Sequence, residues 1–319
     1  MDRKLKIALT VAVIVVLVAA FFVYDTTLKT SAPSNGTITV RDSLGRNITF
    51  NHTLTRIVSI DPSATATLYA LGAYHDLVGG NEFDCYPPNE SIPNVGNSYG
   101  VNQEEIVNLS PQVVLLYGAT IPSYGTQLLN LGIPVLVDNP NSITQIEEET
   151  TMLGVLTGTL KNASLINQWM NQSLLAINKS VSSISSQPEY SAFYYLYAGG
   201  WTAGNGTFIG QIMQYAHLKN IANASGYYEM SSGLIALDNP QVILLDQYVN
   251  YSAVTTPPYN ETSAFLNDRV VSVVNDTFIE DPDFRIIYGI AWILDSVYPT
   301  FVSLPAFPIH LEYPPTYGL

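Results

Sequence analysis

Few residues in this sequence have the types and spacing that catalysis or metal binding requires. Zinc and manganese sites gather several histidines together with carboxylates. The four histidines stand far apart, with no ligand-spaced pair among them: His52, His75, His217 and His310. The single cysteine, Cys85, cannot form an intramolecular disulfide and is typical of a small packed apolar residue. The spacing therefore disfavours direct capture of a metal ion, and we predict no metal site.

The glycine-rich segment 198–204 is the one stretch that suggests an enzyme cofactor loop. It lacks the Gly-x-Gly-x-x-Gly spacing of a dinucleotide site, and no acidic residue ends a next strand about 20 residues further on. The sequence also contains no nucleophile elbow and no P-loop. We therefore predict a binding protein and not an enzyme.

The composition is poor in charge, and especially in bases. Charged residues make up 12% of the chain, and its 12 Lys and Arg against 26 Asp and Glu give a net charge of −14. Such a chain has no basic footprint for a nucleic acid. One physical account is an acidic habitat. Carboxyl groups with reference pKa values of ~4 are mostly protonated there, and a small number of bases then limits positive self-repulsion.

The N-terminal segment predicts export. Three basic residues precede an apolar run over residues 7–23, at the short end of what crosses ~30 Å of hydrocarbon. We predict a transmembrane anchor or signal segment over residues 1–23, favouring an uncleaved anchor, and a polar linker over residues 24–36. Thirteen Asn-x-Ser/Thr sequons agree with a glycoprotein at the extracellular face of the cell membrane. Together with the scarcity of bases, they suggest an archaeal acidophile.

Residues 37–140 carry the pattern of an α/β lobe. Residues 37–50 predict a β-hairpin. After it, short apolar runs alternate with helical segments, which is typical of a parallel sheet with helices on its faces. The predicted strands cover residues 56–60, 77–80, 113–117 and 134–137, and the predicted helices follow Asp61 or cover residues 102–110 and 123–131.

Residues 141–187 contain no strand pattern and predict a long helical connector. Apolar residues from Ile166 to Ile184 recur every three or four positions, which marks one face of a helix. Gly154, Gly158 and Asn162 predict a bend or break before it.

Residues 188–319 repeat the first plan and predict a second α/β lobe. Its strands are expected over residues 191–197, 242–245 and 270–274, and its helices near residues 207–217, 261–266 and 284–296. In both lobes an apolar helix end meets a proline and a buried strand follows, over residues 106–116 and 234–245. This duplication indicates two similar Rossmann-like lobes with central parallel sheets, facing a ligand cleft.

Several motifs occur in a particular order along the chain. They are residues 59–63 after the first strand, the helix end 70–72, the loop 86–88, and segments 95–96, 102–106, 109–114, 131–135 and 239–243. In this combination the chain resembles the iron-siderophore and cobalamin substrate-binding proteins of ABC importers, over about residues 37–310. The resemblance implies a monomer without an enzymatic cofactor. It would capture a ferric siderophore, cobalamin or haem outside the cell and deliver it to the importer permease.

The resemblance also implies which residues contact the ligand in the cleft between the lobes. They are Asp61, Ser63, Tyr86, Tyr99, Trp201, Tyr227 and Arg285. Aromatic rings supply large apolar contacts, the glycines of segment 200–204 let backbone approach closely, and a cationic Arg285 suits an anionic group on the ligand. Alternatives stay open: Asp61 as a helix N-cap, the aromatic residues as core or ordinary surface, and Arg285 as the ion-pair partner of Asp281 or Asp283.

Members of this family present an acidic residue on each lobe to the permease. Glu104 stands at the matching place on the first lobe, and Glu105 is beside it. The matching place on the second lobe is Gly233, so the usual contact is missing there, and Glu229 is the nearby substitute that we predict. Glu104 could instead serve only as a favourable charge in a first helical turn.

Two other functions stay open. The chain could be a metal-ion binding protein of an importer, or a glycosylated adhesion or structural protein of the cell surface. An adhesion protein would predict β-sandwich repeats, which the alternation of strands and helices disfavours.

Overall fold

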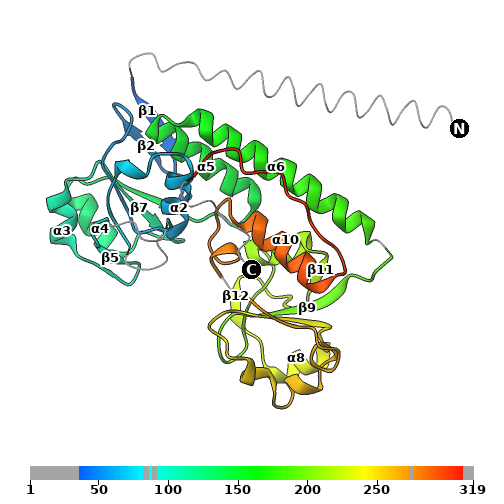
Figure 1. The fold of residues 1–319 in the computed structure, drawn as a ribbon. Coiled ribbons are helices and arrows are strands. Elements are labelled where there is room, and N and C mark those ends of the chain that lie inside the picture. The colour runs from blue at the N-terminus through cyan, green and yellow to red at the C-terminus, as the bar shows by residue number, and fades with distance from the viewer. Residues whose placement is uncertain (1–35, 82–85, 88–91, 185, 274–275, 312–319) are drawn as a thin grey trace, which may run out of the picture. The chain divides into compact units, whose positions relative to one another are not determined.

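The computed structural model describes residues 36–81, 86–87, 92–184, 186–273 and 276–311 (Figure 1). The predicted anchor over residues 1–23 and nearly all of the linker lie outside these ranges. Among the helices of the described part, none has both the length and the apolar character needed to cross a membrane. The chain divides into two compact units, residues 1–39 with 49–52, and residues 40–48 with 53–319.

The hairpin predicted over residues 37–50 is confirmed. Strands β1 (Ile38–Arg41) and β2 (Asn47–Phe50) pair as a two-stranded sheet. Within the smaller unit, the hydroxyls of Thr39 and Thr49 lie 2.8 Å apart.

Two four-stranded parallel sheets form the larger unit, one in each predicted lobe. The first contains β3 (Ile57–Ser59), β4 (Leu77–Gly80), β7 (Val113–Tyr117) and β8 (Val135–Asp138), in the order β4-β3-β7-β8. The second contains β9 (Tyr190–Tyr195), β11 (Leu218–Asn220), β13 (Val242–Leu245) and β14 (Val270–Ser272), in the order β11-β9-β13-β14. In each sheet the second strand lies on one side of the first, and the third and fourth lie on the other. This shared topology confirms the prediction of two similar α/β lobes.

Helices connect the strands of each sheet. The first lobe has α2 (Pro62–Ala70), α3 (Gln103–Leu109) and α4 (Ser123–Asn130), and the second has α7 (Phe208–Tyr215), α8 (Ser232–Asp238), α9 (Ser263–Leu266) and α10 (Ile286–Val297). Helices α3 and α8 end alike, because Ser110 and Asn239 adopt left-handed backbone with φ of 46° and 44°. A proline follows each of them and cannot continue the helix. The repeated helix–proline–strand pattern of the sequence is thus also a repeat in structure.

The predicted connector is a pair of helices, α5 (Ile143–Thr157) and α6 (Leu160–Ser183). Gly158, with φ of 75°, ends α5 in the left-handed conformation that glycine tolerates. Helix α6 begins six residues before the predicted apolar face, because Asn162 lies inside the helix and donates its side-chain N–H to the carbonyl of Leu71 at 2.9 Å. Helix α5 packs on α2, and α6 packs on α5 and α10 (Figure 1). The connector therefore contacts a helix from each lobe.

The shortest elements were not predicted from the sequence. They are strands β5 (Gly96–Asn97), β6 (Gly100–Val101), β10 (Trp201–Ala203), β11 (Leu218–Asn220) and β12 (Tyr227–Glu229), and 3-10 helices η1 (Tyr74–Asp76), η2 (Tyr251–Val254), η3 (Tyr259–Glu261) and η4 (Asp276–Phe278). Two to four residues are too few to display a periodic pattern. Strands β10 and β12 pair antiparallel, so residues 201–203 of the glycine-rich segment 198–204 form a strand.

Each lobe has its own core around its central strands. Residues 113–116 of β7 and 242–245 of β13 are at most 2% exposed. Strands buried on both faces carry continuous apolar runs, and such runs allowed both strands to be predicted from the sequence. The cores anchor the strands rigidly and so fix the positions of the residues that follow them.

Candidate ligand-binding site

In each sheet the chain adds its second strand on one side of the first strand and its third strand on the other side. The point at which the side changes lies between β3 and β7 in the first lobe and between β9 and β13 in the second. In open parallel sheets a crevice forms at the carboxyl ends of the strands at such a switch point, and ligands bind there. Residues 60–63 and 117 stand at this point in the first lobe, and residues 197 and 246–248 stand there in the second.

A cavity of ≈ 400 Å³ lies at these strand ends and is lined by both lobes. The first lobe contributes Ile60, Pro62, Ser63, Asn81, Asn97, Ser98, Tyr99 and Tyr117, and the second contributes Tyr197, Tyr248, Glu280, Asp281 and Pro282. Four tyrosines supply broad apolar faces with hydroxyl groups at their edges, while the amides and carboxyl groups supply directional polar contacts. This lining suits a bulky ligand with a polar periphery.

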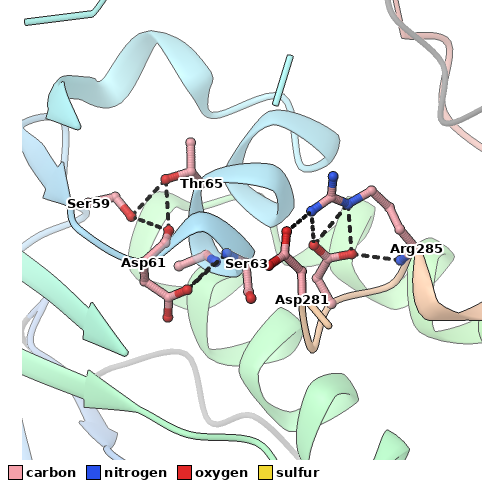
Figure 2. A network of polar contacts seen from close by, with 8 residues as sticks. Ser59, Asp61, Ser63, Thr65, Asp281 and Arg285 are labelled. Atoms are coloured by element: carbon pink, nitrogen blue, oxygen red, sulfur yellow. Dashed lines mark hydrogen bonds and ion pairs between the residues drawn. The ribbon is translucent and has the colours of Figure 1, made fainter. Parts of the chain in front are cut away.

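Asp61 is the N-cap of α2 and lies beneath the cavity, outside its lining. It is fully buried, and its Oδ1 accepts hydrogen bonds from the backbone N–H groups of Ser63 at 2.9 Å and Ala64 at 3.2 Å (Figure 2). Burial, together with repulsion from Asp138, raises the pKa of Asp61 to about 8. The N-cap alternative is therefore the one that the structure shows, and direct ligand contact by Asp61 stays a prediction.

Hydroxyl groups fix the backbone at the same helix start. Ser59 Oγ donates to the carbonyl of Asp61 at 2.8 Å, and Thr65 Oγ1 lies 2.9 Å from both Ser59 Oγ and that carbonyl (Figure 2). All three residues are at most 4% exposed. This network holds the turn that presents Ser63 to the cavity.

Arg285 is buried, with 3% of its surface exposed, and does not line the cavity. Its Nη2 lies 2.9 Å from Asp281 Oδ2 and 2.6 Å from Asp283 Oδ2 (Figure 2). Its guanidinium also lies 5.0 Å from the ring centroid of Tyr86. The ion-pair alternative is the one that the structure shows, and ligand contact by Arg285 stays a prediction.

The other predicted ligand residues divide between the cavity and its surroundings. Ser63 and Tyr99 line it, and Tyr99 is 98% exposed. Tyr86 packs edge-on against Tyr69, with ring centroids 5.3 Å apart. Trp201 and Tyr227 lie on β10 and β12, are about two-fifths exposed, and stand outside the lining. Their role as ligand contacts stays a prediction.

The glycines of segment 200–204 serve the packing of the chain itself. A Cβ atom on Gly200 would collide with the carbonyl of Met230, and one on Gly204 with the carbonyl of Ala224. The close approach expected from these glycines is thus an approach of backbone to backbone. They fix the β10–β12 ribbon that carries Trp201 and Tyr227.

Tyr117, Tyr197, Tyr248 and Glu280 line the cavity and were not predicted. Tyr117 and Tyr197 are the last residues of the predicted strands 113–117 and 191–197, so the rule that sites form at carboxyl ends of parallel strands would have found them. Burial and the carboxyl of Asp246 raise the pKa of Glu280 to about 10, and Tyr194 Oη lies 3.2 Å from Glu280 Oε1. Glu280 therefore offers a neutral carboxyl group to the cavity over the ordinary pH range.

Three carboxyl groups meet behind the second-lobe side of the cavity. One carboxylate oxygen from each of Asp246, Asp276 and Glu280 lies within 4.8 Å of the other two, which is close enough for the three to coordinate a metal ion. The spacing along the chain could not predict this group, because the fold alone brings its members together. Without a bound ion, burial and the neighbouring Asp246 raise the pKa of Glu280, so a proton on Glu280 lowers the repulsion among these acids.

A second cavity, of ≈ 510 Å³, lies against the first lobe and α5. Its lining includes segment 41–45, Asp138 and Glu149. Glu149 is 4% exposed, and burial together with Asp138 raises its pKa well above the ordinary value. No residue of the second lobe lines this cavity among those described, so it lacks the two-lobed construction of the first.

The three residues predicted to dock on a permease lie on two different elements. Glu104 is exposed in the first turn of α3, and Glu105 is half-buried beside it, with its N–H donated to the Asn102 side chain at 3.1 Å. Glu229 is exposed on β12, directly across from Trp201. Gly233 is exposed in α8, the counterpart of α3.

Comparison with known proteins decides the family. The sequence profile of the periplasmic binding proteins matches residues 57–276. The chain belongs to this family. Members of the periplasmic binding protein family are binding proteins and not enzymes, and the family resemblance drawn from the sequence motifs is confirmed.

Individual periplasmic binding proteins support the same assignment. An uncharacterized ABC transporter substrate-binding lipoprotein of Bacillus subtilis (strain 168) is 28% identical over 277 residues, covering 82% of this chain and 86% of the relative. A cobalamin-binding protein of Halobacterium salinarum is 29% identical over 281 residues, covering 83% of this chain and 75% of the relative. A periplasmic heme-binding protein from Pseudomonas aeruginosa shares the fold, with a TM-score of 0.71, 21% identity, and coverage of 80% of this chain and 96% of that structure.

Proposed function

We propose that this chain is the extracellular binding component of an ABC importer and that it captures a metal chelate such as a ferric siderophore, cobalamin or haem. One observation carries the proposal: both lobes contribute the carboxyl ends of their central strands to a single tyrosine-lined cavity of ≈ 400 Å³. That position is where parallel α/β sheets bind ligands. The family assignment and the cobalamin-binding relative support the same reading.

Equilibrium titration of the full-length protein tests this proposal. The probes are cyanocobalamin, the ferric complex of ferrioxamine B, and haem, each followed by intrinsic fluorescence and calorimetry. We expect at least one of them to bind at micromolar or lower concentration. Binding of none of the three would overturn the proposed ligand class.

Two variants of Tyr117 test whether the ligand binds in this cavity. Tyr117 ends the central strand β7 and lines the cavity. Tyr117→Ala removes a ring from the ligand contact and should weaken binding at least tenfold, on the order of 1.4 kcal/mol or more. Tyr117→Phe keeps the ring and should bind within about threefold of the unaltered protein, which separates apolar contact from hydroxyl chemistry. Phe301→Ala, at a residue that is 80% exposed and away from the lining, is the matched control.

We further propose that residues 1–23 hold the protein at the extracellular face of the membrane. The basic flank and apolar run of this segment support it, and the Bacillus relative is a lipoprotein, which is also membrane-attached. Cell fractionation of the full-length chain should find it in the membrane fraction and open to protease added outside intact cells. Recovery of the intact chain from the culture medium would contradict the anchor.

The partner of this binding protein is proposed to be an importer permease that contacts Glu104 and Glu105 on α3 and Glu229 on β12. An exposed charge at a helix start is free to pair with a basic pocket. Glu104→Lys should lower ligand uptake by cells and leave the Kd of the isolated protein unchanged. Glu189→Lys, at another exposed acid, is the control. Uptake that is equal in the two variants would remove Glu104 from the interface.

A further inference from the structure

The ligand cavity is lined by neutral and acidic side chains. Among the described residues that line it, the ionisable groups are Glu280, Asp281 and four tyrosines, with no lysine, arginine or histidine. A cavity without a cation compensates the desolvation of a negatively charged ligand group less well than one that contains a lysine or arginine. The supply of positive charge near the cavity therefore decides which ligands it accepts.

The first lobe has no lysine or arginine in the loops at the carboxyl ends of its strands. Residues 57–160, which contain every loop at the carboxyl ends of β3, β4, β7 and β8, include neither lysine nor arginine. This statement rests on the sequence and so holds for every loop of that range. The one histidine in the range, His75, lies in η1 with an 80% exposed side chain, outside the cavity lining.

The second lobe contains one lysine and two arginines. Lys219 and Arg269 lie at the amino ends of the strands, opposite the cavity. Lys219 pairs in register with Ser191 near the start of β9. Arg269 precedes β14, and its guanidinium lies 4.5 Å from the ring centroid of Tyr190, the first residue of β9. The cavity lies beyond the carboxyl ends of these strands, so both charges are separated from it by the length of the sheet.

The third cation, Arg285, is already matched by acids. It is bonded to both Asp281 and Asp283, so the group of three carries more negative than positive charge. Asp281 also lines the cavity, so the face that this group turns to a ligand is a carboxylate. An anionic ligand group would meet this acid before it met the guanidinium.

We propose that the cavity selects chelates without net negative charge at their buried surface, and that it discriminates against carboxylated or polyanionic chelates. This inference rests on the proposed function, because it names the charge class of the ligand for the same site. Amide-bearing corrinoids and neutral or cationic ferric hydroxamates fit this class, whereas tris-catecholate complexes and free haem carboxylates do not.

The experiment titrates the full-length protein with three matched series whose members differ chiefly in charge. They are cyanocobalamin with its monocarboxylic acid, ferrioxamine B with its N-acetyl and N-succinyl forms, and haem dimethyl ester with haem. In each series that binds, the form with fewer carboxylates should have a Kd at least tenfold lower. Equal or tighter binding of the carboxylated forms would overturn the inference alone. Failure of all three series to bind would overturn the proposed function, and the inference would fall with it.

A charge variant shows whether the cavity itself makes the discrimination. Ser98 lines the cavity and is exposed, so it accommodates a long side chain. Ser98→Lys should reduce the preference for the uncharged form to less than about threefold, whereas Ser98→Gln, of similar reach without charge, should leave it unchanged. An unchanged preference in Ser98→Lys would contradict selection by the charge of the cavity.

Discussion

Asp283 binds Arg285 through both of its carboxylate oxygens. Its Oδ2 lies 2.6 Å from Nη2 and 2.9 Å from Nε of Arg285, and its Oδ1 accepts the backbone N–H of Arg285 at 2.7 Å. Asp283 is fully buried and Arg285 is 3% exposed, so water screens this pair little. The pair fixes the turn that leads into α10 and that presents Asp281 and Pro282 to the cavity.

Substitution of Arg285 should lower the free energy of unfolding. Arg285→Met leaves the buried Asp283 and the partly exposed Asp281 without their partner and should lower the free energy of unfolding by about 3–5 kcal/mol. Chemical denaturation measures the change. Lys161→Met removes an exposed charge on α6 and should stay within about 0.5 kcal/mol of the unaltered protein. A loss below about 1 kcal/mol for Arg285→Met would show that the pair is not the structural device described above.

The stability of the protein should fall as the pH rises from about 4 to about 8. Asp61 has a pKa of about 8 in the folded protein, against an ordinary value of 3.8. Between these values the folded state holds a proton that the unfolded state has released, so each step up in pH favours unfolding. Glu280, with a pKa of about 10, extends the same trend to higher pH. The expected loss between about pH 4 and pH 8 is on the order of 5 kcal/mol from Asp61 alone, since each pH unit between the two pKa values costs about 1.4 kcal/mol.

Two conservative variants test the origin of this pH dependence. Asp61→Asn retains an N-cap oxygen, and Glu280→Gln retains the shape of the side chain, but neither titrates. Each should flatten the curve of unfolding free energy against pH, while Glu189→Gln, at an exposed acid, should leave it unaltered. Greater stability at pH 8 than at pH 4 would contradict this account and would also count against the acidic habitat suggested by the composition.

Two glycine variants should have opposite effects. Gly200 has φ of 88°, and a Cβ atom there would collide with the carbonyl of Met230, so Gly200→Ala should lower the free energy of unfolding by about 2 kcal/mol or more. Gly233 lies in helix α8 with open space around it, and Gly233→Ala should raise that free energy by about 0.5–1 kcal/mol. Thermal and urea denaturation measure both changes. Equal effects would mean that the β10–β12 ribbon tolerates a side chain at Gly200.

The strands and helices that could be predicted from the sequence are those buried on both faces or marked at their ends. The apolar runs of β7 and β13 and the prolines after Ser110 and Asn239 were sufficient to locate the repeated unit. Strand β5 has only two residues and pairs with the nearby β6, whereas β10 pairs with the more distant β12, so neither strand shows a periodic pattern in the sequence. The start of α6 was misplaced because the bond of Asn162 to Leu71 is a tertiary contact.

The site was predicted less well, because its residues are gathered by topology. Ser63 and Tyr99 follow predicted elements and line the cavity, whereas Arg285 pairs with Asp281 and Asp283, which was the alternative left open by the sequence. Tyr117 and Tyr197 were overlooked, although they end predicted strands. The absence of lysine and arginine between residues 57 and 160 was readable from the sequence, and it gains meaning only once those loops are known to surround the cavity.

We propose that the ligand binds where the carboxyl ends of both sheets meet. Hydrogen–deuterium exchange of the full-length protein, with and without the tightest-binding chelate of the panel, tests it most directly. The account predicts protection in segments of both lobes, 60–63, 97–99 and 117–118 in the first and 197–198, 247–249 and 280–283 in the second. Protection confined to the second cavity, at segments 41–45 and 139–152, or to one lobe alone, would contradict it.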